Sequence, residues 1–540
     1  MVPRPVSPYA REPLIPQFYA GKSIFITGAT GFMGKVLVER LLWTCPEIER
    51  IFLLMREKKE VSPEKRLAQL KQSQVFDVIR EYCPGQLEKL YLIPGDTTAP
   101  NLGLSVESIG LLKEVSVVFH SAATLKFDEA LNKAVDQNVR SVLSLMDICD
   151  GMPNIEALVH VSTAYSNAEL STVEERVYAA PVPLQQLLAL ADALPDQLAA
   201  DLTPRLISPK PNTYTFTKAL AENAVAERTN RKYPVAIFRP TIVISALRHP
   251  FPGWIENLNG PSGVLVAAGK GLLHFFCCKR SAKADMIPVD IAIDTLIAAA
   301  WETAVDKLDE IRVYNCSSGR NSTTWAQFEM AIKKLLIEHP LDKTYWYPSG
   351  AAVENEYVNT RRPRTVDGAA STYLLNILQL ITQTIPLHMA EYCSRMIGIK
   401  SRLSLITISE RLQGMCKVLT FFSMREWDFK SDNVRKLQAR LSPQDALIYN
   451  LDPNTIDWDA LYVDFVKGTR KYLLKEKDQD IDEAKRHLRK MFYVHNGFLV
   501  FVTALLLRLS LHAPLVRSLV LGTLRLLFTI VSSTYSRVSS

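Results

Sequence analysis

Short apolar runs recur along the first half of the chain, and stretches of ten or more residues with helical spacing lie between most of them. Six runs stand out because they are rich in β-branched and apolar residues: 22–28, 50–56, 90–96, 115–123, 157–165 and 233–241. Alternation of strands and helices is typical of a parallel, doubly wound α/β sheet of the Rossmann type. Since the runs are apolar throughout, we expect helices to cover both faces of the sheet.

The alternation ends near Arg364, and the segments from 371 to 475 have amphipathic, helical spacing. One helix start is marked by Ser442 as N-cap, followed by Pro443 in the first helical position and Asp445 in the third. The predicted organisation is an irregular lead-in, a Rossmann-like domain with substrate insertions, a smaller mainly α-helical domain and a basic, apolar tail. Their ranges are 1–20, 21–365, 366–480 and 481–540.

The tail contains a candidate membrane helix. Residues 491–507 have no formal charge, and this length of 17 residues is at the lower edge for a membrane span. The next stretch, 514–531, contains Arg517 and Arg525, and each would cost about 2.5–3.5 kcal/mol at the centre of a bilayer. We therefore predict one inserted helix followed by an interfacial helix. A helix packed on the enzyme or on another subunit is the alternative.

Charge is concentrated in the same tail. The net charge is +7, but eight basic residues and no acidic residue lie after residue 483, so the rest of the chain is close to −1. This distribution argues against a nucleic-acid-binding surface. The basic cluster at 485–490 predicts that the bulk of the protein faces the cytosol. Endoplasmic reticulum, peroxisome and lipid droplet all remain open.

Cysteine usage excludes two classes of site. The eight cysteines are scattered, with no C-x-x-C pair and no neighbouring histidine cluster. We therefore expect no metal site and no disulfide framework, as suits a reducing compartment.

A glycine-rich turn, TGATGFMG, follows the first apolar run and opens a periodic helix. Its glycines have separate functions: a tight turn, close approach of backbone N–H groups to a pyrophosphate, and packing of the helix on the strand. This context predicts a dinucleotide site. Its expected contacts are Thr27, Gly28, Thr30, Gly31, Phe32, Met33 and Gly34.

The end of the second run favours NADPH over NADH. Arg56 stands where an acidic residue would bind a ribose hydroxyl, and a guanidinium there can bind a 2′-phosphate instead. Asp96 is placed to contact the adenine, and the small Ala122 leaves room for the cofactor. Asn138 is expected to support the active-site water network, with an ordinary cap or surface asparagine as the alternative.

Tyr214 and Lys218 lie one helical turn apart in PNTYTFTKALAE. A phenol with a pKa near 10 is a weak acid at neutral pH, and a nearby ammonium group favours its ionised form. Lys218 can also bind the nicotinamide ribose. A third group must hydrogen-bond the developing oxyanion, and Thr163, with Ser162 as second choice, stands at the end of a strand. These residues predict hydride transfer to or from a carbonyl.

These motifs resemble the extended short-chain dehydrogenase/reductase superfamily and, within it, the fatty acyl-CoA reductases. The resemblance is carried by TGATGFMGKVLVERLL, the LLMR strand end, HVSTAYSN, YTFTKALAE and FRPTIV, and most specifically by HPFPGWIENLNGPSGVLVAAGKG at 249–271. It continues through ADMIPVDIAIDTLI into a helical region that is similar to the family's sterility-type C-terminal domain. Coverage extends over about 20–476.

The resemblance implies reduction of long-chain acyl-CoA with two NADPH to a primary fatty alcohol and free CoA, as in wax or ether-lipid metabolism. By position, Tyr214 would donate the proton, Lys218 would assist it, and Thr163 (or Ser162) would bind the oxyanion. The first hydride would give a hemithioacetal, which loses the thiolate, and the second would reduce the aldehyde. Acyl chain length and a homodimeric state remain open.

The 249–271 block is expected to cover the acyl chain. Phe251, Trp254 and Leu265 offer apolar surface, and Lys270 could meet the phosphates of CoA. A packed structural loop and a solvated lysine are the alternatives. Two other functions also remain: another membrane-bound superfamily member, such as a steroid dehydrogenase or nucleotide-sugar epimerase, and a non-catalytic lipid-binding scaffold.

Overall fold

The computed structural model describes residues 13–354, 380–396 and 404–512, with the single positions 377, 522, 523 and 525. The chain forms two compact units, each assembled from three separate stretches. The first unit comprises Met1–Gly260, Ser281–Phe328 and Arg425–Leu473. The second comprises Pro261–Arg280, Glu329–Met424 and Leu474–Ser540.

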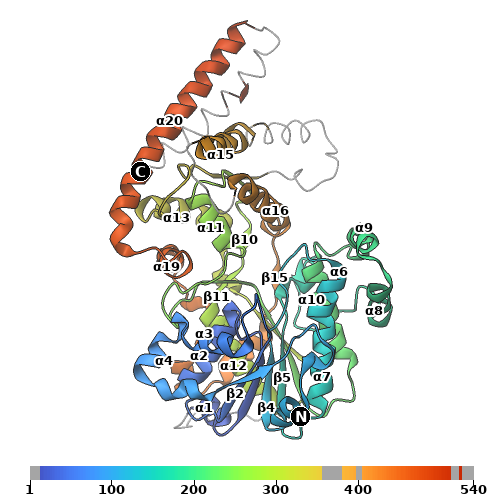
Figure 1. Ribbon diagram of the computed structural model, residues 1–540. Coiled ribbons are helices and arrows are strands. Elements are labelled where there is room, and N and C mark those ends of the chain that lie inside the picture. Colours follow the sequence, from blue (N-terminus) through green and yellow to red (C-terminus); the bar gives the residue numbers. More distant parts are fainter. Residues whose placement is uncertain are drawn as a thin grey trace. The chain divides into compact units, whose positions relative to one another are not determined.

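A seven-stranded parallel sheet forms the centre of the first unit (Figure 1). Its order is β12-β7-β5-β4-β1-β2-β3, so the direction of strand addition reverses between β1 and β4. The strands are β1 (Ser23–Thr27), β2 (Arg50–Met55), β3 (Leu90–Pro94), β4 (Val115–His120), β5 (Ala157–Val161), β7 (Val235–Pro240) and β12 (Arg312–Cys316). The predicted fold class is confirmed, and each of the six predicted runs contains a strand.

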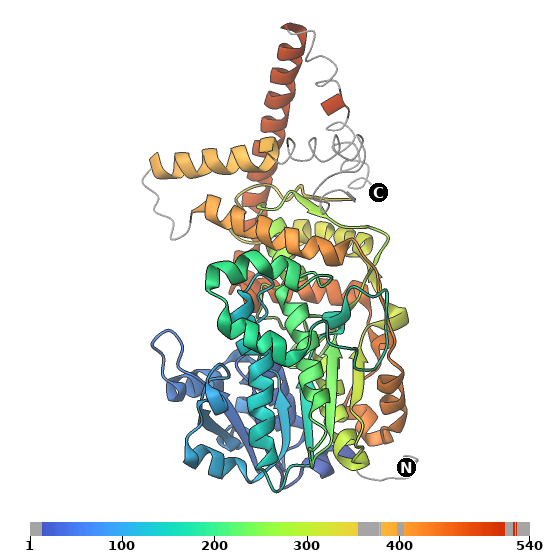
Figure 2. The same cartoon turned by 90° about the vertical axis from the view of Figure 1, so that its right-hand side faces the viewer.

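Helices cover both faces of this sheet, as Figures 1 and 2 show. On one face α12 (Val289–Asp306) packs against α2 (Phe32–Thr44) and against β5 and β7. On the other face lie α7 (Ser141–Asp150) and α10 (Thr213–Glu227), whose Leu145 and Val225 join Phe25 and Val118 of the sheet in one buried cluster. Burial of both faces explains why the strands are apolar at almost every position.

Residues 14–19 form a helix, α1 (Leu14–Tyr19), although the sequence predicts an irregular lead-in there. The carboxylate of Asp445 accepts hydrogen bonds from the backbone N–H groups of Leu14 and Ile15, both at 3.0 Å. Ile15 and Tyr19 are fully buried. A distant carboxylate and a buried face thus stabilise a helix that is too short to form alone. Residues 1–12 lie outside the described part of the chain.

The helical character of the C-terminal region is confirmed. Its described helices are α15 (Ile385–Met396), α16 (Leu405–Ser423), α17 (Asp432–Arg440), α18 (Pro443–Ile448) and α19 (Trp458–Gly468). The predicted start at Ser442 is also confirmed, because its hydroxyl accepts from the backbone N–H of Asp445 at 3.0 Å. The first two helices belong to the second unit and the other three to the first. The boundary predicted at 365 lies outside the described residues.

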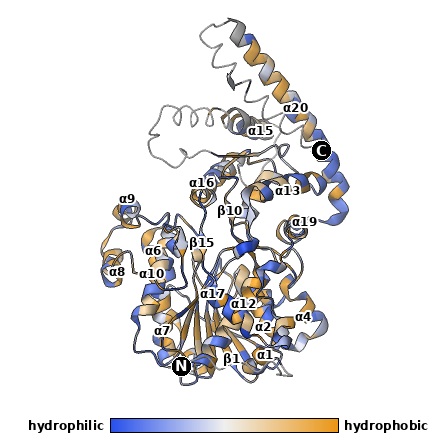
Figure 3. Ribbon diagram, turned by 180° about the vertical axis from the view of Figure 1, so that it is seen from behind, coloured by the Kyte–Doolittle hydropathy of each residue, from blue (hydrophilic) through white to orange (hydrophobic). Residues whose placement is uncertain are grey.

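Within the described residues, one helix is long and apolar enough to cross a membrane, judged by length and composition. This span, Asp478–Arg508, has a mean hydropathy of 1.5 and none of its most apolar stretch is buried. It includes most of α20 (Ile481–His512). Hydrophobic residues become dominant toward the end of α20, whereas its start is hydrophilic (Figure 3). Most of the predicted interfacial stretch, 514–531, lies outside the described residues.

Candidate active site

The glycine turn lies where the order of the sheet reverses, at the carboxyl ends of β1 and β4. Gly28 has a φ of +79°, and a Cβ there would lie 2.7 Å from the backbone nitrogen of Ala122. A Cβ on Gly34 would lie 2.2 Å from the carbonyl oxygen of Gly28. Gly31 is the N-cap of α2 and is exposed, and Phe32 and Met33 of the first turn are partly exposed. The turn therefore fits a dinucleotide, with the N–H groups of α2 accessible to a pyrophosphate.

Two buried histidines lie beneath this turn, at matching positions in β4 and β5. His120 hydrogen-bonds through Nδ1 to the hydroxyl of Thr27 at 2.8 Å, and its ring stacks on His160 with centroids 5.5 Å apart. Burial, with the charge of Lys218, lowers the pKa of His120 to about 3, so the imidazole is neutral. This pair was not predicted from the sequence, although each histidine lies near the end of a predicted strand.

Tyr214 lies in the first turn of α10, which begins with Asn212 as a side-chain N-cap. The hydroxyl of Thr163, just after β5, lies close enough to the phenol of Tyr214 to favour the ionised form of that phenol. Burial raises the pKa of Tyr214 above its ordinary value, and the Thr163 hydroxyl opposes this rise only in part. The phenol therefore keeps its proton at neutral pH in the protein alone.

Lys218 is buried, and its Nζ donates to the carbonyl oxygen of Val161 at 2.7 Å. Burial lowers the pKa of Lys218 to about 8, although the charge of Glu222 favours the ammonium form. Ser162 donates to the same Glu222 at 2.5 Å, and Arg239 donates two further hydrogen bonds to this carboxylate. The two candidate hydroxyls thus differ: that of Thr163 lies beside Tyr214, whereas that of Ser162 donates to the carboxylate of a buried ion pair.

Asn138 is buried in a π-helical turn, Asp136–Arg140, and is neither a cap nor a surface residue. Its carboxamide accepts from the backbone N–H of Thr124 at 2.9 Å and donates to the hydroxyl of Thr217 at 2.9 Å. It therefore ties the segment after β4 to α10, between Tyr214 and Lys218. The same segment brings Phe127 edge-on to the Tyr214 ring, with centroids 5.7 Å apart.

Two arginines meet beside the glycine turn at the end of β2. Arg56 forms an ion pair with Asp96 at 3.1 Å, and both side chains are partly exposed. Arg66, from α3 (Pro63–Lys71), donates to the hydroxyl of Thr30 at 3.0 Å and to the carbonyl oxygen of Arg56 at 2.6 Å. Arg66 was not predicted from the sequence, because its partners, Thr30 and the carbonyl oxygen of Arg56, lie on other parts of the fold.

The predicted cover residues of the first unit pack against other parts of the same unit. Trp254 is fully buried, with its ring centroid 5.0 Å from that of Tyr472, and Phe251 stacks on Tyr472 at 5.9 Å. A Cβ on Gly468 would lie 1.8 Å from the carbonyl oxygen of Gly253, so the two backbones are in direct contact. This packing supports the structural alternative for the turn, and the cover role stays a prediction.

Leu265 and Lys270 belong to the second unit. Leu265 is fully buried in α11 (Pro261–Gly269). The ammonium group of Lys270 donates to the carbonyl oxygen of Asp342 and forms an ion pair with Glu476 at 2.8 Å. Lys270 is therefore not a solvated lysine, and its contact with CoA stays a prediction.

The chain matches known families over most of its length. The family described as male sterility protein matches twice, through its NAD-binding part at 26–296 and its sterile part at 382–476. Fatty acyl-CoA reductase 1 of Xenopus laevis is 36% identical over 496 residues, covering 92% of this chain and 93% of that protein. Fatty acyl-CoA reductase 2 of Bos taurus is 35% identical over 496 residues, covering 92% of each.

One solved structure supports the fold. The reductase domain of a nonribosomal peptide synthetase from Mycobacterium tuberculosis has a TM-score of 0.52 at 16% identity, covering 83% of this chain and 91% of that domain. At this identity the likeness concerns the fold alone. The glycine turn and the NAD-binding family match point to a nicotinamide dinucleotide. With relatives this similar over nine-tenths of its length, the chain belongs to the fatty acyl-CoA reductases, a family of oxidoreductases.

Proposed function

We propose that the protein reduces long-chain fatty acyl-CoA to a primary fatty alcohol and free CoA, using two NADPH. The observation that carries the proposal is the proximity of the Thr163 hydroxyl to the phenol of Tyr214, at the edge of the sheet that carries the Gly28 turn, in a chain of this family. When bound, the reduced nicotinamide supplies the hydride. Thr27, Gly28, Gly31, Gly34 and Ala122 would hold this cofactor.

The hydroxyls of Thr163 and Tyr214 would both donate to the carbonyl oxygen of the substrate. Negative charge develops on this oxygen as the carbonyl carbon gains hydride, and prearranged donors stabilise it. The raised pKa of Tyr214 keeps its proton available, and the ammonium of Lys218 would stabilise the phenolate left after transfer. Ser162 is less suited to binding the oxyanion, because its hydroxyl already donates to Glu222.

Two rounds of this chemistry would complete the reaction. In the first, Tyr214 protonates the thioester oxygen to give a hemithioacetal. Its C–S bond then breaks with the electron pair leaving on the CoA thiolate, while the hydroxyl loses its proton to that thiolate and the carbonyl re-forms, which gives the aldehyde and free CoA. In the second, the resulting aldehyde gains hydride and Tyr214 donates again, giving the alcohol. Each round consumes one hydride and one proton, so the phenol must be reprotonated between rounds.

The preference for NADPH over NADH is part of the proposal. Arg56 and Arg66 bring two guanidinium groups to the end of β2, where the 2′-phosphate of NADPH would lie. The ion pair of Arg56 with Asp96 is partly exposed, and an ion pair in contact with solvent contributes only about 0–1 kcal/mol, so its exchange for a phosphate costs little.

We also propose that α20 inserts into a membrane and that the first unit faces the cytosol. The unburied apolar stretch of the span Asp478–Arg508 supports insertion, and the basic residues at 485–490 support the orientation.

The test is oxidation of NADPH by the purified full-length protein with a panel of acyl-CoA chain lengths. We expect oxidation that depends on acyl-CoA and about two NADPH consumed per fatty alcohol formed, because the thioester needs two hydrides. No oxidation with any acyl-CoA, together with turnover of a sterol or a nucleotide sugar, would overturn the proposal.

A further inference from the structure

Helix α15 has an apolar side that faces away from the protein. Ile385, Met389, Tyr392 and Met396 follow one another at spacings of three or four residues, and Tyr392 and Met396 are 66% and 73% exposed. The opposite side carries Leu387, which packs on Leu272, Ile408 and Leu412. The one acidic residue in the sequence of α15, Glu391, is buried. The outer face of α15 is therefore mainly apolar, with His388 also exposed on it, and carries no acidic group.

Two neighbouring segments, 270–274 and 345–347, link α15 to the middle of α20 within the second unit. Leu272 packs on Leu387 of α15. One residue earlier, a Cβ on Gly271 would lie 2.0 Å from the carbonyl oxygen of Trp346. The indole nitrogen of Trp346 in turn donates to Nδ1 of His495 in α20 at 2.8 Å. The two helices are thus connected through packed contacts of these two segments.

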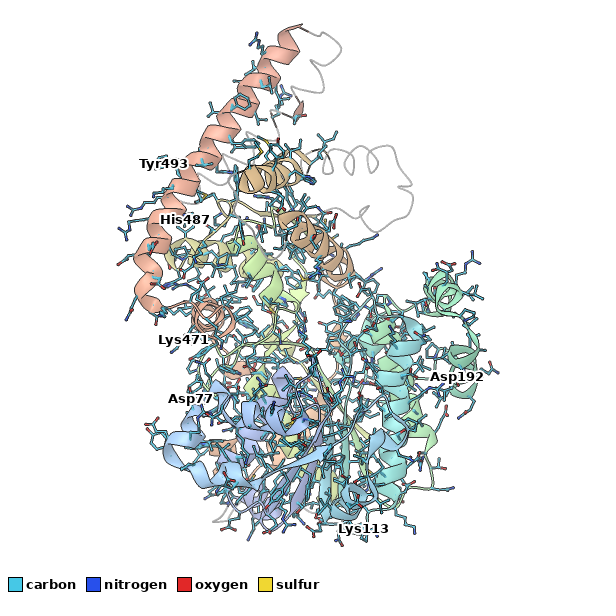
Figure 4. The ribbon with its side chains drawn as sticks, viewed as in Figure 1. Asp77, Lys113, Asp192, Lys471, His487 and Tyr493 are labelled. Atoms are coloured by element: carbon cyan, nitrogen blue, oxygen red, sulfur yellow. The ribbon has the colours of Figure 1, made fainter. Side chains whose placement is uncertain are left out.

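Figures 1 and 2 show α15 level with the middle of α20, and Figure 4 marks Tyr493 near this height. The surface of α20 changes there. Before this level it carries the exposed basic residues Lys485, Arg486, Arg489 and Lys490. Beyond it, Val500 and Phe501 are 69% and 65% exposed, and the sequence has no charge until Arg508.

Aromatic side chains occupy the level between the basic and the apolar part. Trp346 packs against Phe498, and Tyr347 packs against Phe492, with ring centroids 5.6 Å and 5.2 Å apart. Tyr345 beside them is half exposed. Basic residues, then aromatic rings, then an apolar segment is the order expected where a protein enters an anionic membrane.

We propose that the outer face of α15 lies in the headgroup region of the bilayer that α20 enters. A membrane suits this face better than a second copy of the chain, because a stable protein interface buries about 800 Å² per partner. A helix of 12 residues is only about 18 Å long and offers much less on one side. α15 would hold the second unit flat on the lipid while α20 penetrates it.

This inference rests on the proposed insertion of α20, so the experiment examines both helices separately. The photoreactive amino acid p-benzoylphenylalanine replaces Met389 on α15, Phe501 on α20 or Leu447 on α18, in three variants of the full-length protein. Each variant is reconstituted into vesicles of phosphatidylcholine and phosphatidylserine and irradiated. Lipid adducts are then measured by mass spectrometry. All three positions are exposed, Leu447 at 89%, so the last serves as the water-facing control.

We expect roughly tenfold more lipid adduct at Met389 than at Leu447, because an interfacial helix buries its apolar side ~5–10 Å into the headgroup region. Adduct at Phe501 with none above control at Met389 would overturn the inference while leaving the insertion of α20 intact. A protein–protein crosslink at Met389 would also overturn it, in favour of a second copy. No lipid adduct at Met389 or at Phe501 would overturn both the contact of α15 with lipid and the insertion of α20. An unchanged unfolding temperature shows that each variant is folded.

Discussion

The Tyr214 region and the Trp254 turn both carry distinctive motifs, yet the structure uses them differently. In the first, the hydroxyl of Thr163 lies beside the phenol of Tyr214, and we propose that both groups donate to a substrate. In the second, Trp254 is fully buried against Tyr472, and the Gly253 backbone contacts Gly468. A motif can therefore supply groups for chemistry or contacts for packing, and the surroundings of its side chains in the fold distinguish the two uses.

Tyr214→Phe should have the largest effect on activity and little effect on stability. Removing the phenol oxygen removes the proposed acid, and general acids contribute about 10²–10⁴-fold to rate. The measurement is kcat for acyl-CoA reduction, with thermal unfolding in parallel. Tyr233→Phe is the matched control, because it removes a buried tyrosine hydroxyl of the same unit that donates to the Met146 carbonyl oxygen. A Tyr214→Phe variant as active as the parent would show that the pair is not catalytic.

Trp254→Ala should lower stability and leave activity unchanged, which is the reverse of the result expected for Tyr214→Phe. Deleting a large, fully buried aromatic ring typically lowers the free energy of unfolding by about 3–5 kcal/mol, and we expect the folded fraction to keep its kcat. Denaturant unfolding with activity normalised to folded protein checks this. Trp254→Phe should cost less, since it keeps a ring against Tyr472. A raised KM for long-chain acyl-CoA at unchanged stability would instead favour the cover role predicted from the sequence.

Arg66→Ala should change the cofactor preference. A hydrogen bond to a charged group contributes about 1.5–3 kcal/mol, so the KM for NADPH should rise by at least about tenfold while the KM for NADH stays the same. Lys65→Ala on the same helix removes an equal charge that is exposed, and it should leave both constants unchanged. Equal changes for both cofactors in Arg66→Ala would mean that Arg66 supports the turn through Thr30 and does not bind a phosphate.

The pH dependence of kcat/KM should reveal Lys218. Burial lowers the pKa of Lys218 to about 8, with the charge of Glu222 opposing this effect. The ammonium form is the one that stabilises the phenolate, so activity should be constant below this pKa, fall to half at it, and then decrease about tenfold per pH unit. A profile that stays flat well above this pKa would show that the charge of Lys218 is not required.

Local patterns were sufficient for most of the sheet but not for its seventh strand. The six predicted runs are apolar, and their burial follows from that alone. β12 mixes apolar residues with Arg312 and Asn315, and Asn315 is buried because its amide donates to the carbonyl oxygens of Val173 and Lys430. These partners are distant in sequence, so the strand had no local signal.

In the candidate site, too, contacts with residues distant in sequence could not be predicted. The glycine turn and the Tyr214–Lys218 spacing could be read from the sequence because each is complete within a few residues. The different neighbours of Thr163 and Ser162 could not, because they depend on where Glu222 and Tyr214 lie around β5. His120 and His160 each lie in a predicted run, but their pairing could not be predicted, because it depends on the register of β4 and β5.

The hydrogen bonds from α1 to Asp445 also have a consequence for synthesis of the protein. They join residues 431 positions apart, so the first helix has no cap until Asp445 has left the ribosome. At a translation rate of about 5–20 residues per second, this wait lasts roughly 20–90 s. Tyr19, whose hydroxyl donates to the carbonyl oxygen of Ile297, lacks this partner until α12 is made. The unit is complete only at Leu473, just before the nascent chain delivers its apolar helix.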